Sequence, residues 1–108
     1  MNTQISQITI AGEIMQERDR QDQKWGRQNH PSVHRKAGSL LCDITEADAK
    51  ARCTNMNAAG LLTWEDIAVE ELLEALEAGS EAERREELVQ LAAVCVAWIE
   101  CIDRRGAR

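Results

Sequence analysis

No stretch of this sequence alternates β-branched or aromatic residues with polar ones between turn signals, so it holds no candidate β-strand. Alanine and glutamate, both strong helix formers, account for 15 and 13 of the 108 residues, and proline occurs once. Hydrophobic residues make up 44% and charged residues 30%, a balance typical of a globular protein rather than a disordered tail. We therefore expect one all-α domain that spans residues 1–108.

Capping residues and glycines divide the chain into four expected helices. The first should cover about residues 8–25 and end at Gly26, and the second about residues 45–59, with Asp43 or Thr45 as its cap and Gly60 as its end. Residues 63–66 and 80–83 resemble capping boxes, and they predict a third helix that ends at Gly79 and a fourth that runs to about residue 104. Because the last two helices share a very short connection, we expect an antiparallel hairpin.

Charge and apolar run lengths exclude several classes of protein. The longest apolar run, residues 91–99, is far shorter than the roughly 20 residues that a membrane span needs. The first residues lack the pattern of a secretory signal, so we expect a cytoplasmic protein with reduced cysteines. The formal net charge of −6 disfavours nucleic acid as a partner.

Cysteine and histidine spacing gives little support to a zinc site. None of the four cysteines forms a Cys-x-x-Cys pair, and Pro31 lies between His30 and His34, where it disfavours a helix. Cys95 and Cys101 lie in or next to the apolar run and are interpreted as small core residues.

Acidic side chains fall on the apolar side of the third and fourth expected helices. At about 100° per residue, Glu71 lies inside the apolar arc centred on Trp64, Glu74 lies at its edge and Glu70 lies just outside it. On the fourth helix, Glu87 shares the apolar stripe of Trp98. A carboxylate on a core face must be paired, protonated or bound to a cation.

A divalent cation is the simplest counter-charge for these carboxylates. Between Trp64 and Gln90 the chain has ten acidic residues but only two basic ones, Arg84 and Arg85. Oxygen ligands on rigid helices suit Mg²⁺ or Mn²⁺ better than zinc. The alternative is a solvated acidic surface, and the facing of the side chains alone does not decide between the two.

The spacing of these acidic residues resembles a known family. Glu70-Glu71-Leu-Leu-Glu74, twelve further residues and then Glu87-Leu-Val-Gln90 is similar to the Glu-x-x-Glu, spacer, Glu-x-x-Asp pattern of MazG-like all-α nucleoside triphosphate pyrophosphohydrolases. The resemblance implies an oligomeric helical bundle that holds Mg²⁺ and cleaves a (deoxy)nucleoside triphosphate into the monophosphate and pyrophosphate. By position, Glu71, Glu74 and Glu87 would be metal ligands and Gln90 the fourth member.

Gln90 departs from the pattern, because it stands where the family has Asp. An amide offers a neutral carbonyl oxygen but neither a charge nor a base. Glu70, or Asp22 from the first helix, is a candidate for the missing carboxylate, and Glu70 is the first candidate for the catalytic base. Two alternatives follow: a catalytically weakened nucleotide-binding module, and a helical adaptor whose acidic face binds a basic partner.

The N-terminal segment carries a second part of the resemblance, because residues 17–31 look like the substrate-side helix of MazG-like proteins. From Glu17 to Lys36 the chain has six basic and three acidic residues, the charge that a triphosphate needs. The substrate-binding candidates are Arg18 and Lys24 for the phosphates, and Gln21, Trp25, Gln28 and Asn29 for the nucleoside. Trp25 can equally be a core anchor. Residues 27–39 are the expected mobile loop, and we expect this loop to close over the substrate.

The fourth helix is apolar on more than one side, because four residues lie away from the Trp98 stripe: Val89, Ala93, Val96 and Ala97. A helix that is apolar all round is buried all round. We therefore expect at least a homodimer through the third and fourth helices.

Overall fold

The computed structural model describes residues 3–31 and 44–105, and these residues form four α-helices without a strand. The helices are α1 (Thr3–Trp25), α2 (Glu46–Ala59), α3 (Trp64–Leu76) and α4 (Glu81–Arg104). The predicted all-α fold class is confirmed. In the described part of the chain, no helix is long and apolar enough to cross a membrane.

Capping explains where most of the helices begin and end. Thr45 and Thr63 each accept a hydrogen bond from the backbone N–H three residues on and complete a capping box, and Ser80 accepts from the N–H of Glu83. Gly26 and Gly60 have φ angles of 69° and 73°, which glycine adopts at little cost, and they follow the last residues of α1 and α2 as predicted.

Two predicted boundaries are wrong. α1 begins at Thr3 rather than near residue 8, because residues 3–7 contain no proline or glycine that would end the helix. α3 ends at Leu76 rather than at Gly79, and Glu77 caps it. The backbone N–H of Gly79 instead donates to the carboxylate of Glu83, so this glycine belongs to the start of α4.

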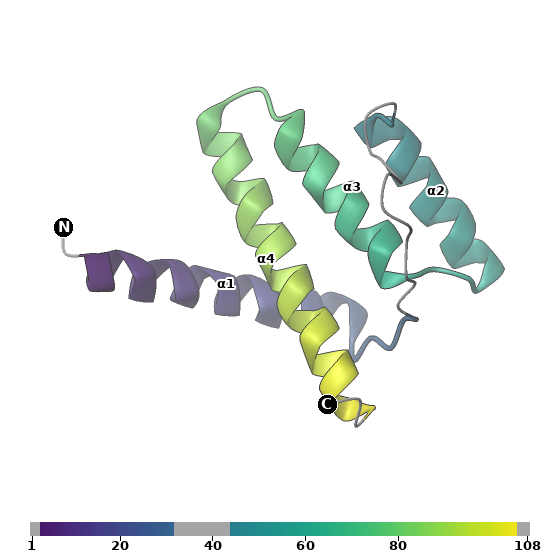
Figure 1. Ribbon diagram of the computed structural model, residues 1–108, viewed down its shortest axis with the longest axis horizontal. Coiled ribbons are helices and arrows are strands. Elements are labelled where there is room, and N and C mark those ends of the chain that lie inside the picture. Colours follow the sequence, from purple (N-terminus) through teal and green to yellow (C-terminus); the bar gives the residue numbers. More distant parts are fainter. Residues whose placement is uncertain (1–2, 32–43, 106–108) are drawn as a thin grey trace, which may run out of the picture.

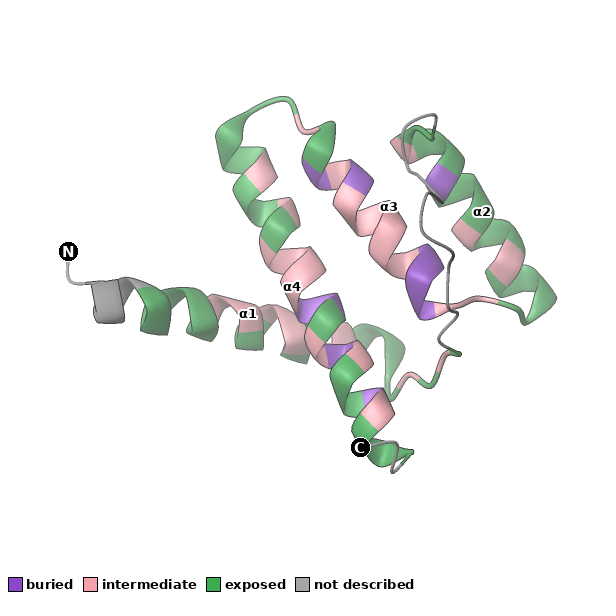
Figure 2. Ribbon diagram, viewed as in Figure 1, coloured by how far each residue is buried: buried purple, intermediate pink, exposed green. Residues whose placement is uncertain are grey.

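The helices pack in the order α1, α4, α3, α2 (Figure 1). α3 and α4 lie side by side and are joined by residues 77–80, α2 packs on the other side of α3, and α1 crosses α4. The N-terminal half of α1 extends away from the other helices, and Figure 2 shows residues 7–12 of it as exposed. Ile8, Ile10 and Met15 are among its exposed apolar side chains.

The buried core lies where α3 meets α4. Trp64, Val94, Ala97 and Cys101 form it, with Ile67 and Trp98 packed against them. The rings of Trp64 and Trp98 are stacked with centroids 6.2 Å apart, and the His30 ring meets the Trp64 ring edge-on at 4.8 Å. This core lies at the end of the α3–α4 pair that contains the start of α3 and the end of α4. The opposite end of the pair contains the acidic residues described below.

Candidate functional site

Three carboxylates meet at the end of the α3–α4 pair away from Trp64. Glu71 and Glu74 are three residues apart on α3 and lie on one face, and Glu87 faces them from α4. One oxygen from each lies within 4.8 Å of the others. The structure therefore brings together the three side chains that the sequence singled out as metal ligands.

No positive side chain neutralises this group in the described ranges 3–31 and 44–105, where no Lys or Arg nitrogen comes within 4.0 Å of its oxygens. Arg84 bonds Glu81 and the carbonyl oxygen of Ala75, and Arg85 bonds Glu13. One oxygen of Glu71 and one of Glu87 are buried without a hydrogen-bond partner. Such orphaned acceptors are costly unless something else binds them.

The crowding changes how these groups ionise. Burial, followed by the negative charges of Glu87 and Glu70, raises the pKa of Glu71 to about 7. Burial, a hydrogen bond to Glu87 and the charge of Glu71 raise the pKa of Glu74 to about 8. A divalent cation would reverse both effects, because it favours the ionised carboxylates.

A second group of carboxylates adjoins the first and shares Glu74. Oxygens of Glu46, Glu70 and Glu74 also lie within 4.8 Å of one another. Glu46 comes from the first turn of α2 and its backbone N–H donates to Glu77 on the α3 side, 2.6 Å away. The sequence did not single out Glu46, because an acidic residue in a first helical turn is ordinarily explained by the helix dipole.

A cavity of about 880 Å³ opens beside the carboxylates, between α1, α2, α3 and α4. A volume of this size suits a small-molecule ligand. Glu70 and Glu71 line it from α3. The other predicted site residues that line it are Gln21, Lys24, Trp25, Gln28, Asn29 and Gln90.

Trp25 is not a core residue, since 61% of its surface is exposed. The ammonium group of Lys24 lies 4.9 Å from the centre of its ring. The indole therefore offers the cavity an aromatic face and is not the core anchor that the sequence also allowed.

Arg18 is the one substrate candidate that the structure does not bring to this cavity. Its guanidinium group bonds Glu100 of α4 at 2.6 Å and Asp22 at 3.6 Å, and its side chain is only 12% exposed. Asp22 is thus engaged by Arg18 and belongs to neither acidic group. Arg20, which the sequence did not single out, lines the cavity while bonded to Glu17.

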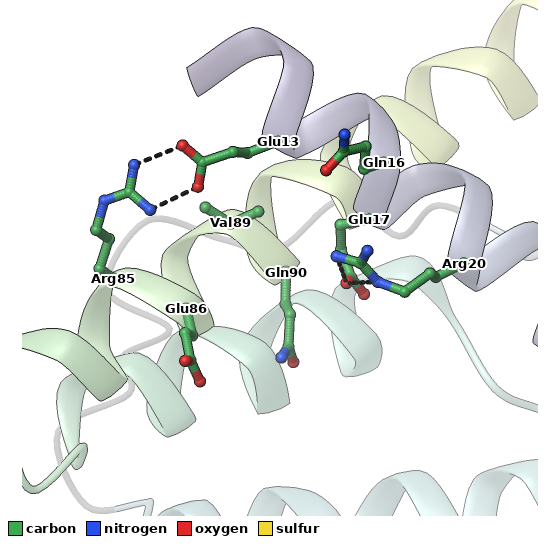
Figure 3. A pocket seen from close by; sticks show the side chains of 8 residues that line it. All are labelled: Glu13, Gln16, Glu17, Arg20, Arg85, Glu86, Val89 and Gln90. Atoms are coloured by element: carbon green, nitrogen blue, oxygen red, sulfur yellow. Dashed lines mark hydrogen bonds and ion pairs between the residues drawn. The ribbon is translucent and has the colours of Figure 1, made fainter. Parts of the chain in front are cut away.

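Gln90 lies between the large cavity and a smaller one of about 320 Å³, because its side chain lines both. Its backbone carbonyl oxygen accepts a hydrogen bond from Gln21 of α1, 3.3 Å away. The smaller cavity lies between α1 and α4, where Arg85 forms two hydrogen bonds to Glu13 and Arg20 binds Glu17 (Figure 3). These ion pairs occupy four of the five charged side chains that line the smaller cavity.

A cysteine and a histidine, Cys53 and His30, also line the large cavity. Burial, followed by the adjacent Glu70 carboxylate, raises the pKa of Cys53 to about 12, so it stays a thiol. Burial, followed by the charge of Arg105, lowers the pKa of His30 and keeps it neutral near pH 7. Neither a thiolate nucleophile nor a histidine cation is therefore available here.

No protein-family model, curated protein or solved structure matches this chain. Of the expected mobile loop, residues 32–39 lie outside the described part of the chain.

Proposed function

We infer that this protein is a MazG-like nucleoside triphosphate pyrophosphohydrolase that uses Mg²⁺ or Mn²⁺ and cleaves a (d)NTP to the (d)NMP and pyrophosphate. The observation that carries the proposal is the group of Glu71, Glu74 and Glu87 oxygens, two of them buried without a partner, beside a cavity with an aromatic face. The resemblance of residues 70–90 to the family pattern agrees with this geometry.

The donor set fits a hard divalent cation. Glu71, Glu74 and Glu87 would hold it through carboxylate oxygens, and the amide oxygen of Gln90 is a neutral fourth donor. Bound there, the cation would neutralise phosphate oxygens and lower the barrier to attack at phosphorus.

The chain's own residues supply the rest of the reaction. Glu70 lines the cavity and accepts a proton from the attacking water. The water oxygen forms a bond to the α-phosphorus, the bond from that phosphorus to the bridging oxygen breaks, and pyrophosphate leaves with that oxygen. Trp25 stacks on the base, and the amides of Gln28 and Asn29 contact its edge.

The test is pyrophosphate release from a panel of ribo- and deoxynucleoside triphosphates with Mg²⁺ or Mn²⁺, for the wild type and for Glu71→Gln. We expect metal-dependent turnover in the wild type and a loss of at least about 100-fold in the variant. Glu86→Gln is the matched control, because it removes an exposed carboxylate outside both acidic groups.

Gln90 favours a second candidate function, a nucleotide-binding module with little catalytic activity. Gln90→Asp separates the two functions. A turnover above that of the wild type would indicate a weakened enzyme, and a turnover below it would indicate that the glutamine itself takes part in catalysis. For a helical adaptor, Mg²⁺ should change neither the thermal stability nor the nucleotide affinity.

We also propose a homodimer in which the α3–α4 antiparallel hairpin meets a second copy. Leu76 of α3 and Leu88 and Ile99 of α4 are exposed at 59%, 47% and 58%, so apolar surface remains uncovered on these helices. Light scattering at micromolar concentration should give twice the mass of one chain, and a monomer would overturn the dimer but not the enzyme.

A further inference from the structure

α2 presents polar side chains to the large cavity. Lys50, Thr54 and Asn57 follow one another at spacings of four and three residues, so they share one face of α2, and all three line the cavity. This helix lies outside the part of the sequence that resembles the family. Its side chains are therefore additional to the residues already assigned.

Lys50 lies at the carboxylate end of the cavity. One turn before it, Glu46 contacts the group that contains Glu70 and Glu74. One turn after it, the Cys53 thiol donates to the carbonyl oxygen of Asp66, 3.1 Å away, on α3. Along the axis of α2, Lys50 therefore lies at the same height as Glu70 of α3, the helix that forms the neighbouring wall of the cavity.

The ammonium group of Lys50 forms no ion pair within the described ranges, although Glu46 and Asp48 lie on the preceding turn of α2. The other cation of α2, Arg52, is held by Asp66 at 2.7 Å. The Thr54 hydroxyl donates to the backbone carbonyl oxygen of Lys50 and is not available as a donor. Lys50 is therefore the charged donor that this wall of the cavity offers to a ligand.

The opposite end of the cavity has a different chemistry. Asn57 lies two turns beyond Lys50, about 10 Å along the helix axis. This end of α2 leads to Trp64, whose backbone N–H donates to the carbonyl oxygen of Pro31 at 3.0 Å, and Asn29 and His30 line the cavity nearby. The cavity therefore has a carboxylate and lysine end and an amide and aromatic end.

We propose that Lys50 binds the two terminal phosphates of the nucleotide, the part that leaves as pyrophosphate, and that the nucleotide lies along α2 with its base towards Asn57. The inference rests on the proposed function and deepens it. An ammonium group opposite the carboxylates neutralises the terminal phosphates and the charge that develops on the leaving pyrophosphate. Lys50 therefore has the phosphate-binding role that was predicted from the sequence for Arg18, which does not line the cavity.

The test compares the affinity of inorganic pyrophosphate and of a deoxynucleoside monophosphate, each measured by calorimetry with Mg²⁺, for Lys50→Ala and the wild type. Lys50→Ala should weaken pyrophosphate binding roughly tenfold, the effect of one charged hydrogen bond, and change monophosphate binding less than about twofold. Lys50→Arg should recover most of the lost affinity, since it keeps the charge.

Arg85→Gln is the matched control, because it removes one positive charge from an exposed ion pair outside the large cavity. An equal loss for both ligands in Lys50→Ala, or no loss for either, overturns the inference. If the wild type hydrolyses nucleotides and Lys50→Ala binds pyrophosphate as well as the wild type, only the inference fails. If the wild type neither binds nor cleaves any nucleotide, both the function and the inference fail.

Discussion

The two ends of the α3–α4 pair are built from opposite chemistry. At one end Trp64 and Cys101 are completely buried in an apolar core, and at the other Glu71 and Glu87 have buried oxygens without partners. The first end stabilises the fold by removing apolar surface from water. The second end costs stability, because like charges are held together in a partly desolvated place. The cation proposed above would offset this cost.

The largest expected effect comes from the apolar end. Trp64→Ala should lower the free energy of unfolding by about 3–5 kcal/mol, because the stacking with Trp98 and the contact with His30 are lost and a large cavity remains. Chemical denaturation followed by circular dichroism measures this loss. A loss below about 1 kcal/mol would show that the core lies elsewhere.

The second effect is a pH dependence that comes from the acidic end. The pKa values of Glu71 and Glu74, about 7 and about 8, lie above the ordinary glutamate value of 4.5. The stability that their protonation contributes is present below pH 4.5 and is lost as the pH rises through 7 and 8.

Thermal unfolding in the presence of a chelator, followed from pH 5 to pH 9, tests this dependence. The melting temperature of the metal-free protein should fall over this range, and saturating Mg²⁺ should reduce the fall. A melting temperature that is flat or rises with pH would contradict the crowding of these carboxyl groups.

Glu87→Gln should raise the free energy of unfolding, by less than Trp64→Ala lowers it. The amide removes one negative charge and can donate to Glu71 or Glu74, so at pH 8 the metal-free variant should be about 1 kcal/mol more stable than the wild type. The stabilisation by Mg²⁺ should disappear. Glu86→Gln should leave the Mg²⁺ response unchanged, and an equal response in the two variants would remove Glu87 from the metal site.

The smallest effect is expected for Arg18→Ala. The pair with Glu100 joins α1 to α4 and is partly exposed, so its loss should cost about 0.5 kcal/mol of stability. Because Arg18 does not line the cavity, nucleotide affinity should stay within about twofold of the wild type. A tenfold loss of affinity without a change in stability would return Arg18 to the phosphate site.

Most of the fold was predictable because its signals are local. Thr63 and Ser80 mark helix starts through hydrogen bonds only three residues long, and Gly60 marks a helix end through its own φ angle. The meeting of Glu71 with Glu87 was also predictable, since helical periodicity and a short connection determine it. Leu76 was expected on the apolar face but is exposed, because α3 ends there and little packs beyond it.

The contributions of α2 to the site were not predictable in the same way. Glu46 and Lys50 reach the site only because α2 packs on α3, and the sequence has no local signal for that contact. Arg18 has the residue type and spacing of a phosphate ligand, yet the position of Glu100 decides where its side chain points. The periodicity of a helix shows which of its faces is apolar, but it does not show which distant helix packs against that face.

The packing order of the helices has a mechanical consequence. Among the four described helices, α1 packs only on α4 and α2 only on α3, so the two outer walls of the large cavity do not touch each other. In the described residues, the α3–α4 contact and the hydrogen bond from Trp64 to Pro31 connect these walls. A small rotation of α3 against α4 would therefore change the distance between α1 and α2. The stacked rings of Trp64 and Trp98 lie at this contact and would resist such a rotation.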